Sequence, residues 1–277
     1  PQKLYIETVR RIRKTAQAIA RSLEITGPFN IQFLARNNDI KVIECNLRAS
    51  RSMPFVSKVT GRNFIREATR RMLGVRDGSP VEALDLDYVA VKAAQFSFSR
   101  LAGADPTLGV EMASTGEVAC FGDTAEEALL KAMLAVGFRV PKRGVLLSLG
   151  PVGDKYRFTD EARTLAELGL RLYATQGTAE ILQAEEIPVE ALDKEDGDGV
   201  LPRAIDVLRD GRIDLVINIP RDYDEKGRPD GFRIRRTAID LEIPLITDLG
   251  LARRVVHAIG KVTAAEILPK PWSAYRP

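Results

Sequence analysis

The spacing of apolar residues predicts helices and strands in mixed order up to about residue 140. Between Tyr5 and Leu23 they recur every three or four residues, as on one face of an amphipathic helix, which Thr26-Gly27-Pro28 should end. Two apolar runs around Asn37-Asn38-Asp39 predict a hairpin, because these residue types tolerate the left-handed conformation of a tight loop. Further elements are expected as a basic helix over 63–73, a strand over 88–98, strands around a turn at 114–116, and a helix over 124–136.

From residue 144 onward, short apolar runs alternate with helical patterns. Strands are expected at 145–149, 171–174, near 189, 214–219 and 244–247, and helices at 154–168, 178–186, 201–209, 233–240 and 250–259. Such alternation is typical of an α/β fold with a doubly wound parallel sheet, whose ligands bind at the carboxyl ends of the strands. The boundary is expected between Gly137 and Lys142, which gives domains 1–140 and 141–277.

Composition narrows the range of functions. The 277 residues suffice for two domains, and a net charge of +3 gives no reason to expect a nucleic-acid partner. Arg233, Arg235 and Arg236 are expected on solvated faces or at local anion sites. Cys45 and Cys120 lie outside any Cys-x-x-Cys motif and predict buried thiols in a reducing, cytoplasmic compartment. No segment has the roughly 18 to 20 apolar residues of a membrane span, and a start at Pro1 within a helical pattern favours a piece of a longer protein.

The predicted hairpin carries a candidate metal site. Glu44 and Asn46 project from the same face of their strand, because side chains alternate along it. A loop of three residues pairs Arg36 with Ile40, and that register sets Gln32 directly opposite Glu44. One carboxylate and two amide oxygens form a ligand set that suits Mg²⁺ or Mn²⁺.

Arg48 and Arg51 follow this strand and supply guanidinium groups suited to phosphate. Taken one at a time, these residues are more simply explained as parts of a surface ion pair or a turn. The combination favours a metal and nucleotide site, because Glu44 follows Val42-Ile43 in a strand that should be buried. A buried carboxylate needs a cation nearby.

The second domain offers a candidate anion site. The strand at 171–174 leads into a helix, whose free N–H groups can hold an anion together with the hydroxyls of Thr175 and Thr178. Gly177 lets the backbone approach the ligand, and Lys155 and Asn218 are expected at the same mouth. An equally simple interpretation is that Thr178 caps its helix and Lys155 is solvated.

Motifs along essentially the whole chain resemble the carbamoyl-phosphate synthetase large chain. The motifs that carry the resemblance are Asn30-Ile31-Gln32-Phe33, Glu44-Cys45-Asn46-Leu47-Arg48-Ala49-Ser50-Arg51, Pro54-Phe55-Val56-Ser57-Lys58, Asp105-Pro106 and Glu111-Met112-Ala113-Ser114-Thr115-Gly116-Glu117-Val118. The resemblance implies that residues 1–140 are the C-terminal part of an ATP-grasp synthetase unit, a mixed α+β fold. It implies that residues 141–277 are a methylglyoxal-synthase-like allosteric domain.

The resemblance also assigns roles to residues. The positions matching Gln32, Glu44 and Asn46 hold divalent metal ions on the ATP phosphates, and those matching Arg48 and Arg51 contact phosphate or the transferred phosphoryl group. The effector pocket is lined by the positions matching Lys155, Thr175, Thr178, Lys194 and Asn218. Leu47 and Cys45 stand where proline and valine are common, and Ile219-Pro220 stands where nucleotide-binding bacterial members tend to have threonines, which weakens the case for a nucleotide effector.

Three hypotheses remain at this point. The first is a C-terminal section of carbamoyl-phosphate synthetase, which in the full enzyme phosphorylates carbamate with ATP to give carbamoyl phosphate. The second is an isolated regulatory module, because half a nucleotide site cannot close over ATP. The third is a fragment of another ATP-grasp carboxylate–amine ligase, against which the effector domain speaks. Methylglyoxal synthase activity is not expected, since the one histidine, His257, lies far from the loop 222–231 where that enzyme's histidine falls.

Partners follow from the first two hypotheses. The expected partners are the remainder of the large chain, a glutaminase small subunit or domain and a small-molecule effector, and a homo-oligomer is an open alternative. Neither nucleic acid nor a membrane is expected. The sequence leaves the pathway open between arginine and pyrimidine synthesis.

Overall fold

The computed structural model describes residues 4–50, 52–75, 86–109, 113–194, 201–220, 231–263 and 267–275. The chain forms two compact units, unit 1 up to Leu86 and unit 2 from Asp87 to Tyr275. The segment 87–140 therefore packs with the parallel-sheet part of the chain. The expected boundary at 140/141 divides domains and not compact units, so it stays a prediction.

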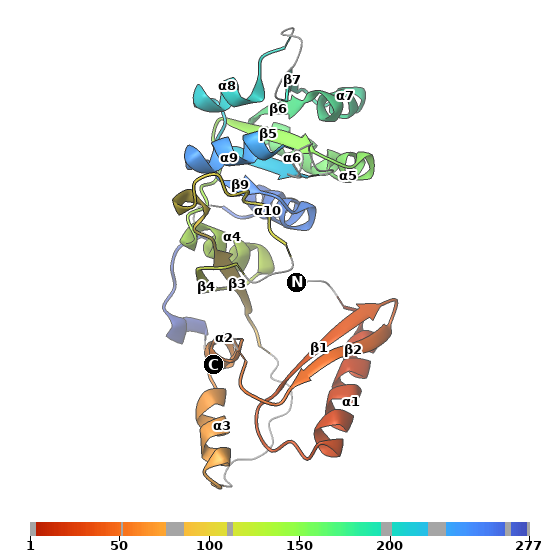
Figure 1. Cartoon of the computed structure of the whole chain (residues 1–277), viewed down its shortest axis with the longest axis vertical. Coiled ribbons are helices and arrows are strands. Elements are labelled where there is room, and N and C mark those ends of the chain that lie inside the picture. The colour runs from red at the N-terminus through yellow and green to blue at the C-terminus, as the bar shows by residue number, and fades with distance from the viewer. Residues whose placement is uncertain are drawn as a thin grey trace. The chain divides into compact units, whose positions relative to one another are not determined.

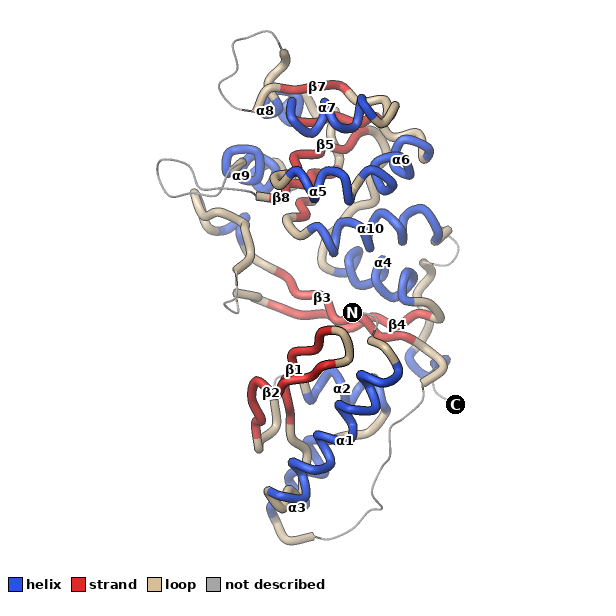
Figure 2. The backbone as a smooth tube through the Cα atoms, turned by 90° about the vertical axis from the view of Figure 1, so that its right-hand side faces the viewer, coloured by secondary structure: helices blue, strands red, loops and turns tan. Residues whose placement is uncertain are grey.

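Unit 1 contains the expected hairpin between helices. Its elements are α1 (Ile6–Ser22), β1 (Asn30–Arg36), β2 (Asp39–Asn46), α2 (Met53–Thr60) and α3 (Phe64–Met72), as Figure 2 shows. Helix α1 packs on the hairpin, where the buried Thr8 hydroxyl donates to Asn38 Oδ1 at 2.7 Å. Helix α2 is an addition to the expected elements, and Asn63 caps α3 by accepting a hydrogen bond from the Arg66 amide at 2.9 Å.

The hairpin register differs from the expected one at the turn but agrees at the site. Only Asn37 and Asn38 form the turn, both at positive φ (49° and 65°), so Arg36 pairs with Asp39 and the predicted pairing with Ile40 is wrong. A β-bulge after Gln32 then shifts the register by one residue. The shift brings Gln32 opposite Glu44, and this predicted pair is confirmed.

Unit 2 is built on a five-stranded parallel sheet of order β7-β6-β5-β8-β9, which confirms the predicted doubly wound α/β fold. The strands are β5 (Gly144–Leu149), β6 (Arg171–Thr175), β7 (Glu190–Leu192), β8 (Leu215–Ile219) and β9 (Leu245–Ile246). The chain runs from β5 to β6 and β7 on one side and returns to β8 and β9 on the other. The topological switch point, where such sheets bind ligands, therefore lies between β5 and β8.

Helices cover both faces of this sheet (Figure 1). One face packs against α5 (Val152–Arg157), α6 (Thr159–Glu167), α7 (Gln176–Ala184) and α10 (Leu249–Lys261), and the other against α8 (Ala204–Arg209) and α9 (Phe232–Asp240). The helix expected over 154–168 is divided at Phe158, whose ring is fully buried in the first of these cores. The break therefore coincides with a buried aromatic side chain.

A second layer of unit 2 packs on α10. It consists of β3 (Val89–Gln95), β4 (Gly116–Gly122), the short η1 (Phe98–Arg100) and α4 (Ala125–Ala135), with β3 and β4 antiparallel. Thr124 caps α4 by accepting a hydrogen bond from the Glu127 amide at 3.2 Å. The final turn η2 (Trp272–Tyr275) returns to this layer, where the Tyr275 hydroxyl donates to Phe121 O at 3.2 Å and its ring lies 5.8 Å from that of Tyr88.

Two further expectations concern the burial of the thiols and the absence of a membrane span. Cys45 and Cys120 are both free, and both are half-buried rather than fully buried. Burial raises the pKa of the Cys120 thiol. In the described part of the chain, no helix combines the length and the apolar character that crossing a membrane requires.

Candidate functional site

The hairpin brings the three predicted metal ligands together. Gln32 and Glu44 are direct cross-strand partners, so their side chains leave the same face of the sheet. Asn46 lies on that face too, since its Nδ2 donates to Glu44 Oε1 at 3.0 Å. One carboxylate and two amides thus converge without any rearrangement of the backbone, and an amide rotation of Asn46 would turn its oxygen to the same point.

The burial expected around Glu44 is wrong. Ile43 and Val42 expose 62% and 42% of their surface, and Glu44 itself is exposed. Leu34 on β1 is 61% exposed as well, so the exposure of apolar side chains belongs to the hairpin as a whole and not to one position. A solvated carboxylate needs no cation, so the geometry of the donor set carries the metal hypothesis and burial does not.

The two arginines contribute unequally to this geometry. Arg48 is exposed, and its Nη1 donates to the neighbouring Ala49 O at 3.3 Å. Arg51 lies outside the described residues. Within the described ranges, no group of three or more His, Cys, Asp or Glu side chains could hold a metal ion.

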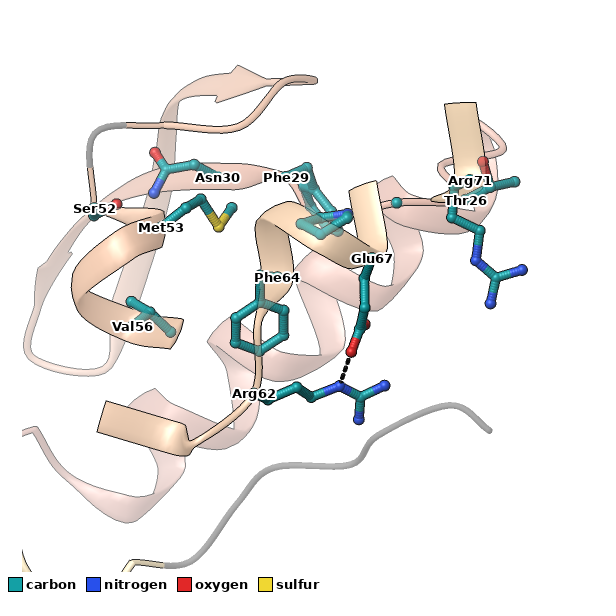
Figure 3. Close-up of a pocket in the computed structure, with 12 residues that line it drawn as sticks. Thr26, Phe29, Asn30, Ser52, Met53, Val56, Arg62, Phe64, Glu67 and Arg71 are labelled. Carbon is teal, nitrogen blue, oxygen red and sulfur yellow. Dashed lines mark hydrogen bonds and ion pairs between the residues drawn. The ribbon is translucent and has the colours of Figure 1, made fainter. Parts of the chain in front are cut away.

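A cavity of about 470 Å³ opens at the start of the hairpin (Figure 3). Asn30, the register partner of Asn46, lines it. Its other walls are partly apolar, with Met53 and Phe64, and partly charged, with an ion pair between Arg62 and Glu67 that the dashed line in Figure 3 marks. The cavity therefore lies at the end of the hairpin that bears the predicted ligands.

A row of polar side chains crosses unit 2 at the carboxyl ends of three neighbouring strands. Ser148 on β5 is the register partner of Asn218 on β8, at the topological switch point. Thr175 ends β6 beside it, and its hydroxyl lies 3.4 Å from the Ser148 hydroxyl. All three are buried. Ser148 was not among the predicted residues, although it is the one polar residue in the apolar run 145–149.

The remaining predicted effector residues surround this row. Lys155 Nζ donates to Gly177 O at 2.8 Å, and a Cβ on Gly177 would lie only 3.0 Å from that ammonium group. Thr178 does not cap its helix, because α7 begins at Gln176. Its buried hydroxyl instead accepts a hydrogen bond from the Leu149 amide at 3.1 Å.

Lys194 lies two residues past the end of β7, whose last residue, Leu192, is the register partner of Thr175. It comes after Asp193, a buried carboxylate whose Oδ2 has no hydrogen-bond partner within the described residues. The six predicted residues thus occupy the ends of β6, β7 and β8 and the adjoining helices α5 and α7.

Two of the three arginines that were expected on solvated faces or at local anion sites are buried. Arg235 on α9 is completely buried, with 0% of its side chain exposed, and Arg236 is buried as well. Arg235 donates from Nη1 to Asn218 Oδ1 at 2.7 Å, and from Nε and Nη2 to the two carboxylate oxygens of Asp105 at 2.8 and 2.6 Å. No signal in the sequence connects Asp105 with Arg235, because 130 residues separate them.

The charge pair changes the titration of Asp105. Burial by itself raises the pKa of the Asp105 carboxyl, but hydrogen bonds from Arg235 and Thr107 outweigh it and hold the pKa below the ordinary value for aspartate. The carboxylate is therefore ionised at neutral pH and neutralises the buried guanidinium.

Comparison with known proteins shows that each of the two sites lies largely in a segment that matches a known family. Residues 1–76 match the family described as carbamoyl-phosphate synthase L chain, ATP binding domain, and residues 157–247 match the MGS-like domain. The multifunctional protein URA2 of Saccharomyces cerevisiae is 48% identical over 94% of this chain, which covers 12% of that relative. The chain is homologous to a section of the carbamoyl-phosphate synthase large chain.

Other relatives match the chain over a similar share of its length. The multifunctional protein CAD of Squalus acanthias is 43% identical over 94% of the chain, and the mitochondrial carbamoyl-phosphate synthase [ammonia] of Homo sapiens is 43% identical over 91%. The chain covers 12% and 17% of these two relatives, so each is a much longer protein.

His257, the one histidine of the chain, lies on the exposed side of α10, and its Nε2 is 3.3 Å from Glu126 Oε1, as is usual for a surface residue.

Proposed function

We propose that this chain is the section of a carbamoyl-phosphate synthase that completes its second ATP site and binds its effector. In the full protein the activity is the ATP-dependent phosphorylation of carbamate to carbamoyl phosphate. The observation that carries the proposal is the convergence of Gln32, Glu44 and Asn46 on one face of a hairpin, within the segment that matches the ATP-binding domain.

Gln32, Glu44 and Asn46 would hold Mg²⁺ or Mn²⁺, whose oxygen-ligand preference fits one carboxylate and two amides. When bound, the metal supplies positive charge to the β- and γ-phosphates of ATP. Arg48 and Arg51 would add guanidinium donors for phosphate and for the transferred phosphoryl group, since phosphoryl transfer depends mainly on positioning and charge. In this proposal each residue orients the nucleotide, and none forms a covalent bond to it.

Residues 141–277 would bind a small anionic effector at the ends of β6 and β8. The α7 amino terminus beside Thr175, the ammonium group of Lys155 and the amide of Asn218 support this part of the proposal, because together they suit a phosphate or a carboxylate. Ser148 joins this set as a residue that the sequence had not indicated. Lys194 extends it at the end of β7.

The isolated chain would bind effector without synthetase activity. Among the described residues, unit 1 buries only two apolar side chains, Met53 and Ala68, while Leu34, Val42 and Ile43 on the hairpin are exposed. A nucleotide site on so open a surface cannot exclude water. The remainder of the large chain and a glutaminase partner would complete the enzyme, in a cytoplasmic location and in arginine or pyrimidine synthesis.

Calorimetric titration of the chain with UMP, UTP, IMP, ornithine, N-acetylglutamate and Mg-ATP tests the proposal. One effector should bind and Mg-ATP should not. Thr175→Ala should abolish effector binding, whereas Thr164→Ala, which removes an exposed hydroxyl bonded within its own helix, should leave it unchanged. Tight Mg-ATP binding that Glu44→Ala removes would contradict the inactivity of the isolated chain, and silence across the panel would contradict the effector site.

A further inference from the structure

Arg235 connects the proposed effector site to a segment that precedes the MGS-like domain. Its guanidinium is fully buried and forms a bidentate pair with Asp105, while its third donor holds the oxygen of Asn218. A buried guanidinium must be neutralised, and Asp105 supplies the carboxylate. Asp105 lies outside residues 157–247, which match the MGS-like domain.

We propose that Asp105 is a positioning residue of the effector site, acting through Arg235 on Asn218. The inference rests on the effector site proposed above and extends it by one residue from outside the domain. Its consequence is that effector affinity depends on the segment around Asp105, and by linkage that effector binding acts on this segment with the same free energy.

The hydrogen bonds at Asn218 explain how the effect reaches a ligand. Because Arg235 donates to Oδ1 at 2.7 Å, the amide is fixed with Nδ2 as its free end, a donor. The only hydrogen bond that Nδ2 makes within the described residues is long, 3.5 Å to Ser148 O. An anionic oxygen at the switch point can therefore replace this weak bond, provided that the amide keeps its orientation.

A second residue of helix α9, Arg236, also holds the segment that contains Asp105. Arg236 Nη1 donates to the carbonyl oxygens of Phe98, Leu101 and Ala104 at 3.1, 3.0 and 3.2 Å. At the start of the helix, a Cβ on Gly231 would lie 2.7 Å from Asn218 Nδ2, so backbone and amide are in close contact there. Helix α9 is thus held between Asn218 and residues 98–105, and a shift of either affects the other.

Asp105 is itself fixed in place. The Thr107 amide and hydroxyl both donate to its Oδ1, at 3.1 and 2.8 Å. The carboxylate therefore meets the guanidinium from one direction, as a positioning role requires. Thr107 also offers a mild way to disturb the pair without removing it.

The test uses the whole chain and two substitutions of Asp105. Asp105→Asn keeps the shape of the side chain but removes its charge, and Asp105→Glu restores a carboxylate. Asp240→Asn is the matched control, because Asp240 is the exposed partner of Arg236 on the same helix. Affinity is measured by calorimetry with UMP and with N-acetylglutamate, which carry a phosphate and carboxylates respectively. The side-chain amide resonances of Asn218, identified by their loss in Asn218→Ser, report its orientation without any ligand.

The proposal requires that Asp105→Asn weakens binding about tenfold and shifts the Asn218 resonances. Asp105→Glu should recover part of both effects, and Asp240→Asn should change neither. Unchanged affinity together with unchanged resonances in Asp105→Asn overturns the proposal, even if the melting temperature falls. If the unsubstituted chain binds neither probe, the proposed effector site fails and the resonances alone decide the link between Asp105 and Asn218. If Asp105→Asn does not fold, Thr107→Val takes its place, with a smaller loss of affinity expected and no loss overturning the inference.

Discussion

The pair of Asp105 and Arg235 should be energetically asymmetric, because its two members differ in access to water. Arg235 is 0% exposed, whereas Asp105 retains 18% of its side-chain surface. Asp105→Ala leaves a guanidinium that water cannot reach. Of the hydrogen bonds of Arg235 described above, only the one to Asn218 then remains. Arg235→Met leaves a carboxylate that water can reach and that Thr107 still holds.

The magnitudes follow from these contacts. Removing one member of a buried pair costs about 3 to 5 kcal/mol when the other charge stays buried, so Asp105→Ala should lower the free energy of unfolding by about 3 kcal/mol or more. Arg235→Met should cost about 1 to 2 kcal/mol, since methionine fills most of the volume and the stranded charge is hydrated. The double variant should be more stable than Asp105→Ala alone, because it contains no buried cation without its carboxylate.

Urea denaturation at pH 7 measures the three free energies, and hydrogen exchange at the β5 and β8 amides assigns the transition to unit 2. The difference between the unsubstituted chain and Asp105→Ala should shrink in acid. The folded-state pKa of Asp105 is lowered, so its contribution is complete above the unfolded-state pKa and is lost as pH falls through the folded-state value. An Asp105→Ala chain as stable as Arg235→Met, or a double variant less stable than both, would refute the reasoning.

Three further substitutions test local features of unit 2. Gly144→Ala should destabilise the unit by about 3 kcal/mol, since the added Cβ would lie 2.5 Å from a backbone oxygen. Gly153→Ala is the control, because its Cβ meets nothing within 4 Å, and it should change stability by less than about 1 kcal/mol in either direction. Equal melting temperatures for the two variants would contradict this difference. Thr124→Ala should cost about 1 kcal/mol through loss of the α4 cap, measured by urea denaturation; a loss below experimental error would show that the cap is dispensable. Burial raises the pKa of Asp214, but hydrogen bonds from Arg143 and from backbone amides outweigh it and lower the pKa. Asp214→Asn should therefore destabilise the fold at neutral pH and lose its effect as pH falls through the lowered folded-state pKa. A pH-independent difference in the free energy of unfolding would argue against this cause.

The sequence predicted the parallel sheet well because that information is local. Each strand of unit 2 is a short apolar run and each helix has its own periodicity, so neither depends on distant partners. The hairpin is a more instructive case. A turn of two residues and a bulge after Gln32 offset each other, so the predicted pairing with Glu44 is right although the pairing at the turn is wrong.

The parts that could not be predicted depend on contacts far apart in sequence. Arg235 and Arg236 look like residues of a solvated helix face, because the Asp105 carboxylate that neutralises Arg235 and the Ala104 carbonyl that accepts from Arg236 lie some 130 residues earlier. Ser148 gives no signal because a single polar residue within an apolar run looks like part of a buried strand. It is nevertheless the residue that pairs with Asn218 across the switch point. The exposure of Glu44 could not be predicted either, because the apolar residues around it indicate a buried strand whether or not another element covers that strand.

The aromatic contact between Tyr88 and Tyr275 has a consequence for modularity. It places the first and last described parts of unit 2 side by side, with ring centroids 5.8 Å apart. A unit whose ends meet can be joined to other chains at a single point, or circularly permuted through a short linker, without threading through its own core. Unit 2 therefore has the geometry of an exchangeable part, which a synthetase can acquire, or an engineer can transplant, as one piece.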